Sequence, residues 1–280
     1  MGTYRAGGEN LVDGFGQGET STSGRGQLLI PWPNRLEDGI YVWDGRRHQL
    51  PLTEPDHRNA IHGLVRWLPW AVREREASRV VLAHDLKPQR GYPFSLALTV
   101  EYTLSAAGLQ VRTTATNVGA EACPFGCGAH PYVSVGTATV DSVELSVPGR
   151  TVLLSDERGL PVGSQSVEQA GLDFRRPRRI GEARLDHAFA DLERDDDGLA
   201  RVQLRDPDSG TGLTLWVDES YRYLMLFTGD PLPDVARRSV AVEPMTCPPN
   251  AFRSGESLIR LEPGAFWTGA WGIEPTVASA

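Results

Sequence analysis

Short runs of β-forming residues recur about every ten residues along this chain, each bounded by turn residues. No stretch shows the apolar spacing of an amphipathic helix three turns long. Residues 94–104 alternate between apolar and polar side chains over much of their length, as in a strand with one buried face. The pattern predicts an all-β fold, a large antiparallel β-sandwich. We expect strands at 40–43, 49–52, 79–83, 94–104, 109–116, 132–135, 142–147, 151–154, 201–204, 212–217, 222–227, 257–261 and 266–271.

Turn signals define how some of these strands connect. Asp44-Gly45 directly after residues 40–43 predicts a β-hairpin. The first thirty residues are rich in glycine, serine and threonine, so only residues 28–30 are expected to start a packed element there. A polar, arginine-rich loop is expected between residue 154 and Arg184.

Length and charge limit the kind of protein this is. The 280 residues contain no internal repeat, low-complexity linker or change in composition, which predicts one domain over residues 1–280. A formal net charge of -8 argues against nucleic acid or an anionic membrane as a partner, and favours a small neutral ligand. No window approaches the ~18 apolar residues of a membrane span, and the N-terminus lacks the apolar core of a signal peptide. We therefore expect a cytoplasmic protein.

Several familiar sites are excluded by their spacing. The 3 cysteines are too few for a disulfide framework, and Cys123 and Cys127 lack partners that would complete a zinc site, so we interpret them as reduced and inert. The acidic run 193–198 is interpreted as a solvated turn, because a calcium loop would need a glutamate where Leu204 stands. There is also no nucleophile elbow, His-Glu-x-x-His motif or P-loop.

Five polar residues at loop or strand ends form the candidate site: Arg35, His62, His130, Asp186 and Glu243. Taken singly, each is better explained by a structural role. Together they offer an acid, a base and hydrogen-bonding groups without a nucleophile, which indicates chemistry made only of proton transfers. The 7 tryptophans and 7 tyrosines provide rings that stack on sugars.

The backbone around His130 is constrained by its neighbours in the sequence. Gly126 and Gly128 precede it and Pro131 follows it, before the strand-like run 132–135. This arrangement predicts an imidazole held at the edge of a sheet. We expect the two glycines to let the backbone bring His130 close to a ligand.

At these residues the sequence resembles the aldose 1-epimerase (galactose mutarotase) family, over about residues 24–273. The matching segments are Asn34-Arg35 before a hairpin, Ile61-His62-Gly63, His130-Pro131-Tyr132, Leu185-Asp186-His187-Ala188-Phe189 and Glu243-Pro244. The resemblance implies a galactose mutarotase-like supersandwich with a sugar-binding groove.

The resemblance also implies an isomerase that interconverts the α and β anomers of free aldohexoses such as galactose and glucose. Glu243 would be the general base at the anomeric hydroxyl and His130 the general acid at the ring oxygen. Arg35, His62 and Asp186 would bind the sugar hydroxyls. We expect hydrogen bonds or cations that keep Glu243 ionised, and a site that keeps His130 protonated near neutral pH. No metal or organic cofactor is implied; the partner is a monosaccharide, and the protein a monomer or homodimer.

The substrate stays open at this point. Arg25-Gly26 and the segment 31–33 resemble elements of the related hexose-6-phosphate 1-epimerases, for which Arg25, Arg58 and Arg66 are candidate phosphate ligands. The other alternative is a non-catalytic carbohydrate-binding protein on the same fold.

Two further expectations concern aromatic residues and the N-terminus. Any of Trp32, Trp67 and Trp70 is a candidate stacking wall for a sugar, although core packing is the better explanation for each taken singly. Family members usually have a β-hairpin before the segment that residues 10–14 resemble. The chain is therefore expected to lack this first hairpin; either its start codon is misassigned or the protein leaves a sheet edge open.

Overall fold

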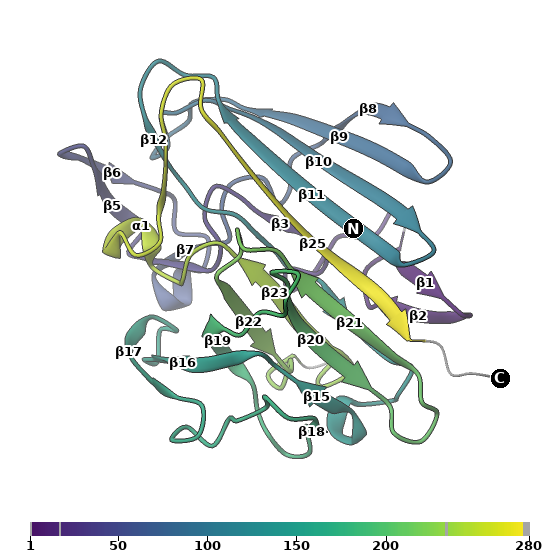
Figure 1. Cartoon of the computed structure of the whole chain (residues 1–280). Helices are drawn as coiled ribbons and strands as arrows, with labels where there is room; N and C mark the ends of the chain where they lie inside the picture. The colour runs from purple at the N-terminus through teal and green to yellow at the C-terminus, as the bar shows by residue number, and fades with distance from the viewer. Residues whose placement is uncertain (1, 17, 233–234, 277–280) are drawn as a thin grey trace.

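The computed structural model describes residues 2–16, 18–232 and 235–276. Most of its strands belong to two large sheets, and every strand pair in them is antiparallel (Figure 1). One short α-helix, α1 (Ala251–Ser254), and two 3₁₀ turns, η1 (Pro55–His57) and η2 (Val140–Ser142), are the helical elements of the described residues. The predicted all-β sandwich is confirmed.

The first sheet has ten strands, and it carries the site described below. Its order is β1-β2-β14-β23-β22-β19-β16-β17, with β13 and β3 attached beside β23. The bounds are β1 (Tyr4–Ala6), β2 (Glu9–Val12), β3 (Leu28–Leu29), β13 (Gly128–Ala129), β14 (Tyr132–Val133), β16 (Gly149–Ser155), β17 (Pro161–Ser166), β19 (Asp186–Leu192), β22 (Tyr223–Phe227) and β23 (Val240–Met245).

The second sheet has nine strands, in the order β18-β15-β20-β21-β25-β11-β10-β9-β8. The bounds are β8 (Ala71–Arg75), β9 (Arg79–Leu86), β10 (Leu96–Ser105), β11 (Gly108–Asn117), β15 (Glu144–Ser146), β18 (Arg178–Arg179), β20 (Ala200–Arg205), β21 (Gly212–Val217) and β25 (Phe266–Thr276). The long strand β25 pairs with β11 on one side and β21 on the other, and so joins the two halves of this sheet.

Three two-stranded sheets complete the fold. They pair β4 (Arg35–Glu37) with β7 (Asn59–Ile61), β5 (Ile40–Trp43) with β6 (Arg46–Gln49), and β12 (Cys123–Phe125) with β24 (Ile259–Leu261).

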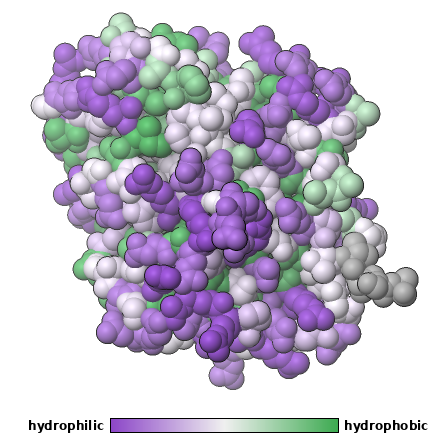
Figure 2. Space-filling view, viewed as in Figure 1, coloured by the Kyte–Doolittle hydropathy of each residue, from purple (hydrophilic) through white to green (hydrophobic). Residues whose placement is uncertain are grey.

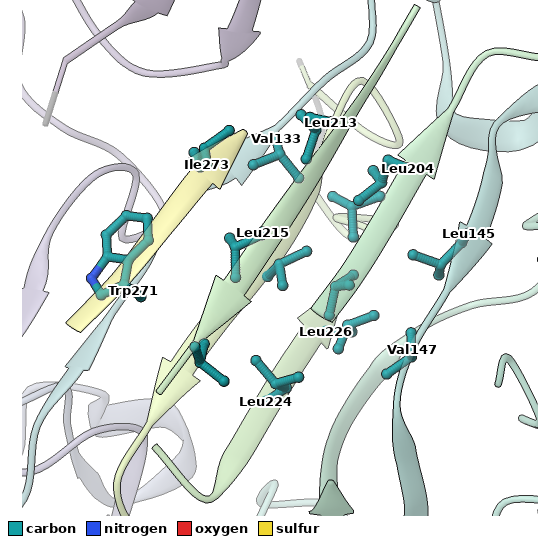
Figure 3. Packing of buried hydrophobic residues seen from close by; sticks show 14 of the residues in the cluster. Val133, Leu145, Val147, Leu204, Leu213, Leu215, Leu224, Leu226, Trp271 and Ile273 are labelled. Carbon is teal, nitrogen blue, oxygen red and sulfur yellow. The ribbon is translucent and has the colours of Figure 1, made fainter. Parts of the chain in front are cut away.

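The main core lies between the two large sheets, because alternate residues of each strand point into it. From the ten-stranded sheet come Leu224 and Leu226, which are fully buried. From the nine-stranded sheet come Leu215 and Ile273, which are buried against them. Figure 3 shows these side chains filling the space between the strands. The alternate residues Met225 and Phe227 of β22 therefore face away from the core, where they line the floor of a cavity.

The hairpin predicted at Asp44-Gly45 is confirmed as β5–β6, but its second strand was placed too late. The turn occupies only two residues, so pairing starts at Arg46 and ends at Gln49. Pro51 has no N–H to donate to a ladder, and the predicted strand 49–52 is wrong.

Two segments assigned to loops contain strands. Strand β17 lies inside the arginine-rich segment, and a hairpin, β1–β2, occupies the N-terminal region. In β17 the side chains are exposed or half-buried, so no apolar alternation marks the strand in the sequence. A strand therefore precedes the segment around Asn10, with β1 at the sheet edge. That the family's usual first hairpin is missing stays a prediction.

The face of the molecule seen in Figure 2 is mostly hydrophilic, with scattered hydrophobic residues between the charged ones. No helix of the described residues has both the length and the apolar character needed to cross a membrane.

Candidate active site

A cavity of about 360 Å³ lies on the outer face of the ten-stranded sheet, and all five predicted site residues line it. This volume is in the range of small-molecule pockets. Its other lining residues are Ser23, Gly24, Asn34, Thr53, Glu54, Ile61, Arg66, Trp67, Tyr132, Met225, Phe227, Pro231 and Leu232.

The alternation of the strands builds the cavity floor. In β23, Val242 points into the core, and the next residue, Glu243, points into the cavity. Glu243 lies opposite Met225 of β22 in the ladder, and Phe227 lies opposite Asp186 of β19. Residues from distant parts of the chain are thus fixed side by side by strand register.

One wall of the cavity comes from β4, β7 and the residues next to them. The backbone N–H of Asn34 donates to His62 Nδ1 at 3.2 Å, and the N–H of His62 donates to the Asn34 carbonyl at 2.9 Å. Both residues have positive φ, 55° for Asn34 and 61° for His62, which is uncommon outside glycine and often found at functional sites. Because Nδ1 accepts, the neutral His62 ring carries its proton on Nε2, where it is a donor.

Arg35 is held by a bidentate ion pair with Glu54. Arg35 Nε lies 2.9 Å from Glu54 Oε2, and Nη2 lies 2.9 Å from Oε1. Asn59 Nδ2 donates to Glu54 Oε2 at 3.0 Å and so fixes the carboxylate from the other side. Burial opposes ionisation of Glu54, but the bonds from Arg35 and Asn59 outweigh it and lower the pKa. The guanidinium therefore lies in a fixed position in the cavity.

His130 and Glu243 contact one another at the base of the cavity. His130 Nε2 lies 3.3 Å from Glu243 Oε1, and the two side chains are buried. His130 Nδ1 and Glu243 Oε2 have no hydrogen-bond partner among the described residues. These two buried atoms are therefore unsatisfied by the described residues.

The electrostatics of this pair differ from the expectation. Burial raises the pKa of Glu243 well above its ordinary value, and the charge of Asp186 adds to this. Burial also lowers the pKa of His130, helped by the positive charge of Arg25. Both directions are opposite to the expectation of an ionised Glu243 and a protonated His130. Desolvation favours a neutral acid beside a neutral imidazole.

The position of His130 also corrects the prediction of a sheet edge. The residue lies between β13 and β14, inside the ten-stranded sheet. A Cβ on Gly126 would lie 2.6 Å from Cys247 Sγ, and one on Gly128 2.9 Å from Pro33 Cβ, so these glycines accommodate neighbouring segments rather than a ligand. The glycine that packs on the imidazole is Gly24, where a Cβ would overlap His130 Cδ2.

Asp186 is the exposed member of the five and lies at the start of β19. Partial desolvation by the surrounding protein raises the pKa of its carboxyl, while the charge of Arg35 opposes the shift. It can accept hydrogen bonds from a ligand at the mouth of the cavity.

Of the three tryptophans considered, only Trp67 lines the cavity, and it is 60% exposed. Trp32 is buried, with its ring centroid 5.4 Å from that of Phe252, and Trp70 packs against His84. A stacking wall, if a sugar binds, can therefore come from Trp67 but not from the other two.

The three candidate phosphate ligands do not converge. Arg66 lines the cavity, and no carboxylate of the described residues lies within ion-pair distance of it. Arg58 is exposed and pairs with Asp38 at 3.4 Å. Arg25 is buried behind Tyr132 and does not line the cavity.

Among the described residues, His62, His130 and Glu243 are the set whose ligand atoms, all within 4.8 Å of one another, are suited to a metal ion. The guanidinium groups of Arg35 and Arg66 line the same cavity and disfavour a cation there. The cysteines lie elsewhere, as buried free thiols; burial raises the pKa of Cys123 to about 11, which keeps that thiol protonated.

Sequence reasoning missed Glu54 and Gly24. Glu54 lies 19 residues from the arginine that it holds, in a polar loop without a recognisable spacing. Gly24 belongs to a glycine-rich segment whose members look alike in the sequence. Only the three-dimensional contacts distinguish these two residues.

The fold and the cavity together define a galactose mutarotase-like β-sandwich with acid, base and hydrogen-bonding groups in one pocket. The profile of the family described as aldose 1-epimerase matches residues 4–273, and the chain belongs to this family.

Individual relatives agree with this assignment. The chain is 37% identical over 240 residues to the uncharacterized protein YihR of Escherichia coli strain K12, covering 85% of this chain and 75% of the relative. Among solved structures, a GalM/aldose epimerase homologue from C. elegans superposes with a TM-score of 0.86 at 18% identity, over 97% of this chain and 89% of that one. A galactose 1-epimerase from Lactobacillus acidophilus gives a TM-score of 0.80 at 23% identity, over 96% and 86% of the two chains. At these identities the structures support the fold.

Proposed function

We propose that the protein is an aldose 1-epimerase that interconverts the α and β anomers of a free aldohexose, with glucose and galactose as the first candidates. The observation that carries the proposal is the contact between His130 and Glu243, a buried acid and base 3.3 Å apart in a cavity that also holds Arg35, His62 and Asp186. Ring opening and closure need only proton transfers, and these groups suffice for them. We also keep a cytoplasmic location as part of the proposal.

In this mechanism Glu243 takes the proton of the anomeric hydroxyl, and His130 gives a proton to the ring oxygen. The reactive state has an ionised Glu243 and a protonated His130, whereas the open-chain sugar faces a neutral acid and a neutral imidazole. Burial raises the pKa of Glu243 and lowers the pKa of His130, so it opposes formation of the ionised pair but favours both transfers once that pair has formed. Rotation about C1–C2 and closure return the two protons.

The other groups orient the sugar. His62 remains neutral, because burial lowers its pKa and the neighbouring His130, Arg66 and Arg35 add to the effect, so Nε2–H is a neutral donor. Arg35 supplies a charged donor that Glu54 holds in place, and Asp186 supplies an acceptor. Donors fixed before the reaction stabilise charge that develops on the sugar oxygens.

A phosphorylated hexose is the second candidate substrate, and a single observation favours it. Arg66 lines the cavity without a carboxylate partner among the described residues, so its charge is available to an anionic substituent. Phosphate sites usually combine two or more cations. The free sugar therefore stays the first choice.

The test follows the optical rotation of freshly dissolved α-glucose, α-galactose and α-glucose 6-phosphate. Glu243→Gln and His130→Asn keep the shape of the side chains, and we expect each to lower the catalysed rate by about 10²- to 10⁴-fold. Glu262→Gln, a change at an exposed residue that does not line the cavity, is the matched control and should retain the parent rate. Arg66→Gln should reduce the rate on glucose 6-phosphate alone if that sugar is the substrate.

Two results would contradict the proposal. If the parent protein never exceeds the spontaneous rate on a broad panel of sugars, it is not an epimerase, and a non-catalytic carbohydrate-binding protein becomes the better explanation. If both Glu243→Gln and His130→Asn keep the parent rate, another pair of residues transfers the protons.

A further inference from the structure

Arg25 is a buried cation outside the cavity. It is 3% exposed, and none of its three guanidinium nitrogens has a hydrogen-bond partner among the described residues. Removing a charge from water without hydrogen bonds is unfavourable by several kcal/mol, so such groups are rare unless they have another use. The mechanism described above does not explain this residue.

The nearest carboxylate forms an ion pair with Arg25 but accepts no hydrogen bond from it. Arg25 Nε lies 3.5 Å from Asp13 Oδ2. Asp13 is already bonded to Arg238 Nη2 at 2.7 Å and to Ser239 Oγ at 2.8 Å. Asp13 would therefore keep two partners if Arg25 were neutral.

The closest contact of the guanidinium is an aromatic ring. Arg25 Cζ lies 4.2 Å from the centroid of the Tyr132 ring, a cation–π contact. The Tyr132 ring in turn lies nearly parallel to the His130 imidazole, with an interplanar angle of 12° and centroids 4.9 Å apart. Arg25, Tyr132 and His130 thus form one stack that ends at the proposed general acid.

The backbone holds the same three residues together. The N–H of Gly26 donates to the His130 carbonyl at 2.9 Å, and the N–H of His130 donates to the Gln27 carbonyl at 3.0 Å. The Tyr132 hydroxyl donates to the Ser23 carbonyl at 3.0 Å. The turn that carries Arg25 is therefore tied to both sides of His130.

We propose that Arg25 is a positioning residue for the proton transfer at His130: its stack with Tyr132 holds the imidazole of the proposed general acid in place. This inference rests on the proposed function. According to this inference, the reaction depends on a residue that does not contact the sugar.

The charged and titratable groups around His130 come from several elements. Glu243 faces it from β23, His62 from the end of β7, Arg66 from the following loop, and Tyr132 from β14. Glu243, His62 and Arg66 line the cavity, and changing them would also change sugar contacts. Arg25 is the cation whose removal leaves the cavity lining intact, so its effect should appear in kcat rather than in KM.

The test compares Arg25→Met and Arg25→Lys with the parent. We expect Arg25→Met to lower kcat by about 10- to 100-fold with KM within about twofold, because a misplaced acid slows the transfer. Its melting temperature should equal or exceed that of the parent, since replacing a buried charge by an apolar side chain of similar length is often stabilising. Arg25→Lys retains the charge but not the planar stack, and should recover part of the rate.

A second measurement does not need turnover. In ¹⁵N-histidine-labelled protein without sugar, the pKa of His130 should rise in Arg25→Met and stay close to the parent value in Arg25→Lys. Arg238→Met is the matched control, because Arg238 bonds the same Asp13 but does not contact Tyr132. It should leave both the kcat and the His130 titration unchanged.

The outcomes separate the two proposals. If no sugar is turned over by the parent, the proposed function fails, while the His130 titration still decides whether Arg25 acts on the imidazole. If Arg25→Met leaves the His130 titration unchanged and only lowers the melting temperature, Arg25 is a structural residue. An equal effect of Arg238→Met would show that the change acts through Asp13, and would overturn the inference.

Discussion

Gly24 sets how closely its turn approaches His130. Its φ is +78°, and an added Cβ would overlap the edge of the imidazole. We predict that Gly24→Ala displaces His130 and lowers kcat by about 10- to 100-fold, since small misplacements of a reacting group slow proton transfer. Steady-state kinetics on the sugar identified by polarimetry measure this effect.

A second glycine separates displacement from backbone strain. Gly264 has nearly the same φ, +79°, but no heavy atom lies within 4 Å of its added Cβ. Gly264→Ala should lose about 1 kcal/mol of unfolding free energy from backbone strain and retain full activity, whereas Gly24→Ala should lose more because of the added overlap with His130. If the two variants lose activity equally, contact with His130 is not the cause.

Glu243 makes stability depend on pH in a direction opposite to that of most carboxylates. Its folded pKa is raised by burial, so the folded state binds its proton more tightly than the unfolded state does. The stability it contributes is fully present below the unfolded value of about 4.3 and is lost as the pH rises through the folded pKa. We predict that Glu243→Gln is more stable than the parent by about 1–3 kcal/mol at pH 8, and nearly equal to it at pH 4.

Urea unfolding of parent and variant across this pH range measures the difference. Titrating groups remote from Glu243 cancel in the comparison, whereas His130 and Asp186 interact with Glu243 and contribute to the difference. A difference that stays constant with pH, or a variant that is less stable at pH 8, would show that Glu243 is ionised without penalty in the folded protein.

The five candidate residues could be found from the sequence because each is a polar side chain beside glycine, proline or a strand end. Their common location in one cavity could not be predicted from the sequence. Asp186 and Glu243 are brought into the cavity by the register of β19, β22 and β23. The shifted pKa values also depend on burial, which no local pattern contains. For this reason the shifts in the pKa values of His130 and Glu243 run opposite to the expected charge states.

At the scale of elements, the turn between β16 and β17 supports the wall that carries Arg35. Arg158 in this turn donates to the carbonyls of His57 and Arg58, at 2.9 and 3.0 Å, and to Asp38 Oδ1 at 3.0 Å. Asn59 Nδ2, which also holds Glu54, donates to the Arg158 carbonyl at 2.9 Å. The turn therefore connects the ten-stranded sheet to the β4–β7 pair.

We predict that Arg158→Ala loosens this connection. The loss of several half-buried hydrogen bonds should cost about 1–3 kcal/mol of unfolding free energy, and KM should rise several-fold because Arg35 and Glu54 become less fixed. Denaturant unfolding and steady-state kinetics measure the two effects. Arg58→Ala is the control, because Arg58 is exposed and makes only a 3.4 Å ion pair with the same Asp38. Equal losses in both variants would contradict the proposed support.

The elements that could be predicted are those with a clear apolar period. Residues 212–217 were predicted as a strand and form β21 (Gly212–Val217), where buried and half-buried side chains mostly alternate. Strand β8 is exposed along its whole length and lies at a sheet edge, so it has no such period. An outer segment such as β8 becomes a strand because it pairs with a neighbouring strand, and not because of its own composition.

At the scale of the whole molecule, two buried clusters make up most of the core. One lies between the two large sheets and includes Leu224 and Leu215, and the other surrounds Tyr41 and Phe125 near the small sheets. Trp267 packs against both clusters. Its ring centroid lies 5.4 Å from that of Phe125 and 5.8 Å from that of Tyr221. The ring therefore couples the two parts of the core.

This coupling supports the prediction of a single domain over residues 1–280, which unfolding experiments can test. We expect one guanidinium transition, with the same midpoint by tryptophan fluorescence and by far-UV circular dichroism. Trp267→Ala should lower the unfolding free energy by about 2–4 kcal/mol, because it removes contacts with both clusters at once. Phe266→Ala, a change to an exposed neighbour in the same strand, should alter it by less than about 0.5 kcal/mol. Two separate transitions in the parent would show that the clusters unfold independently, and that the chain is not one cooperative unit.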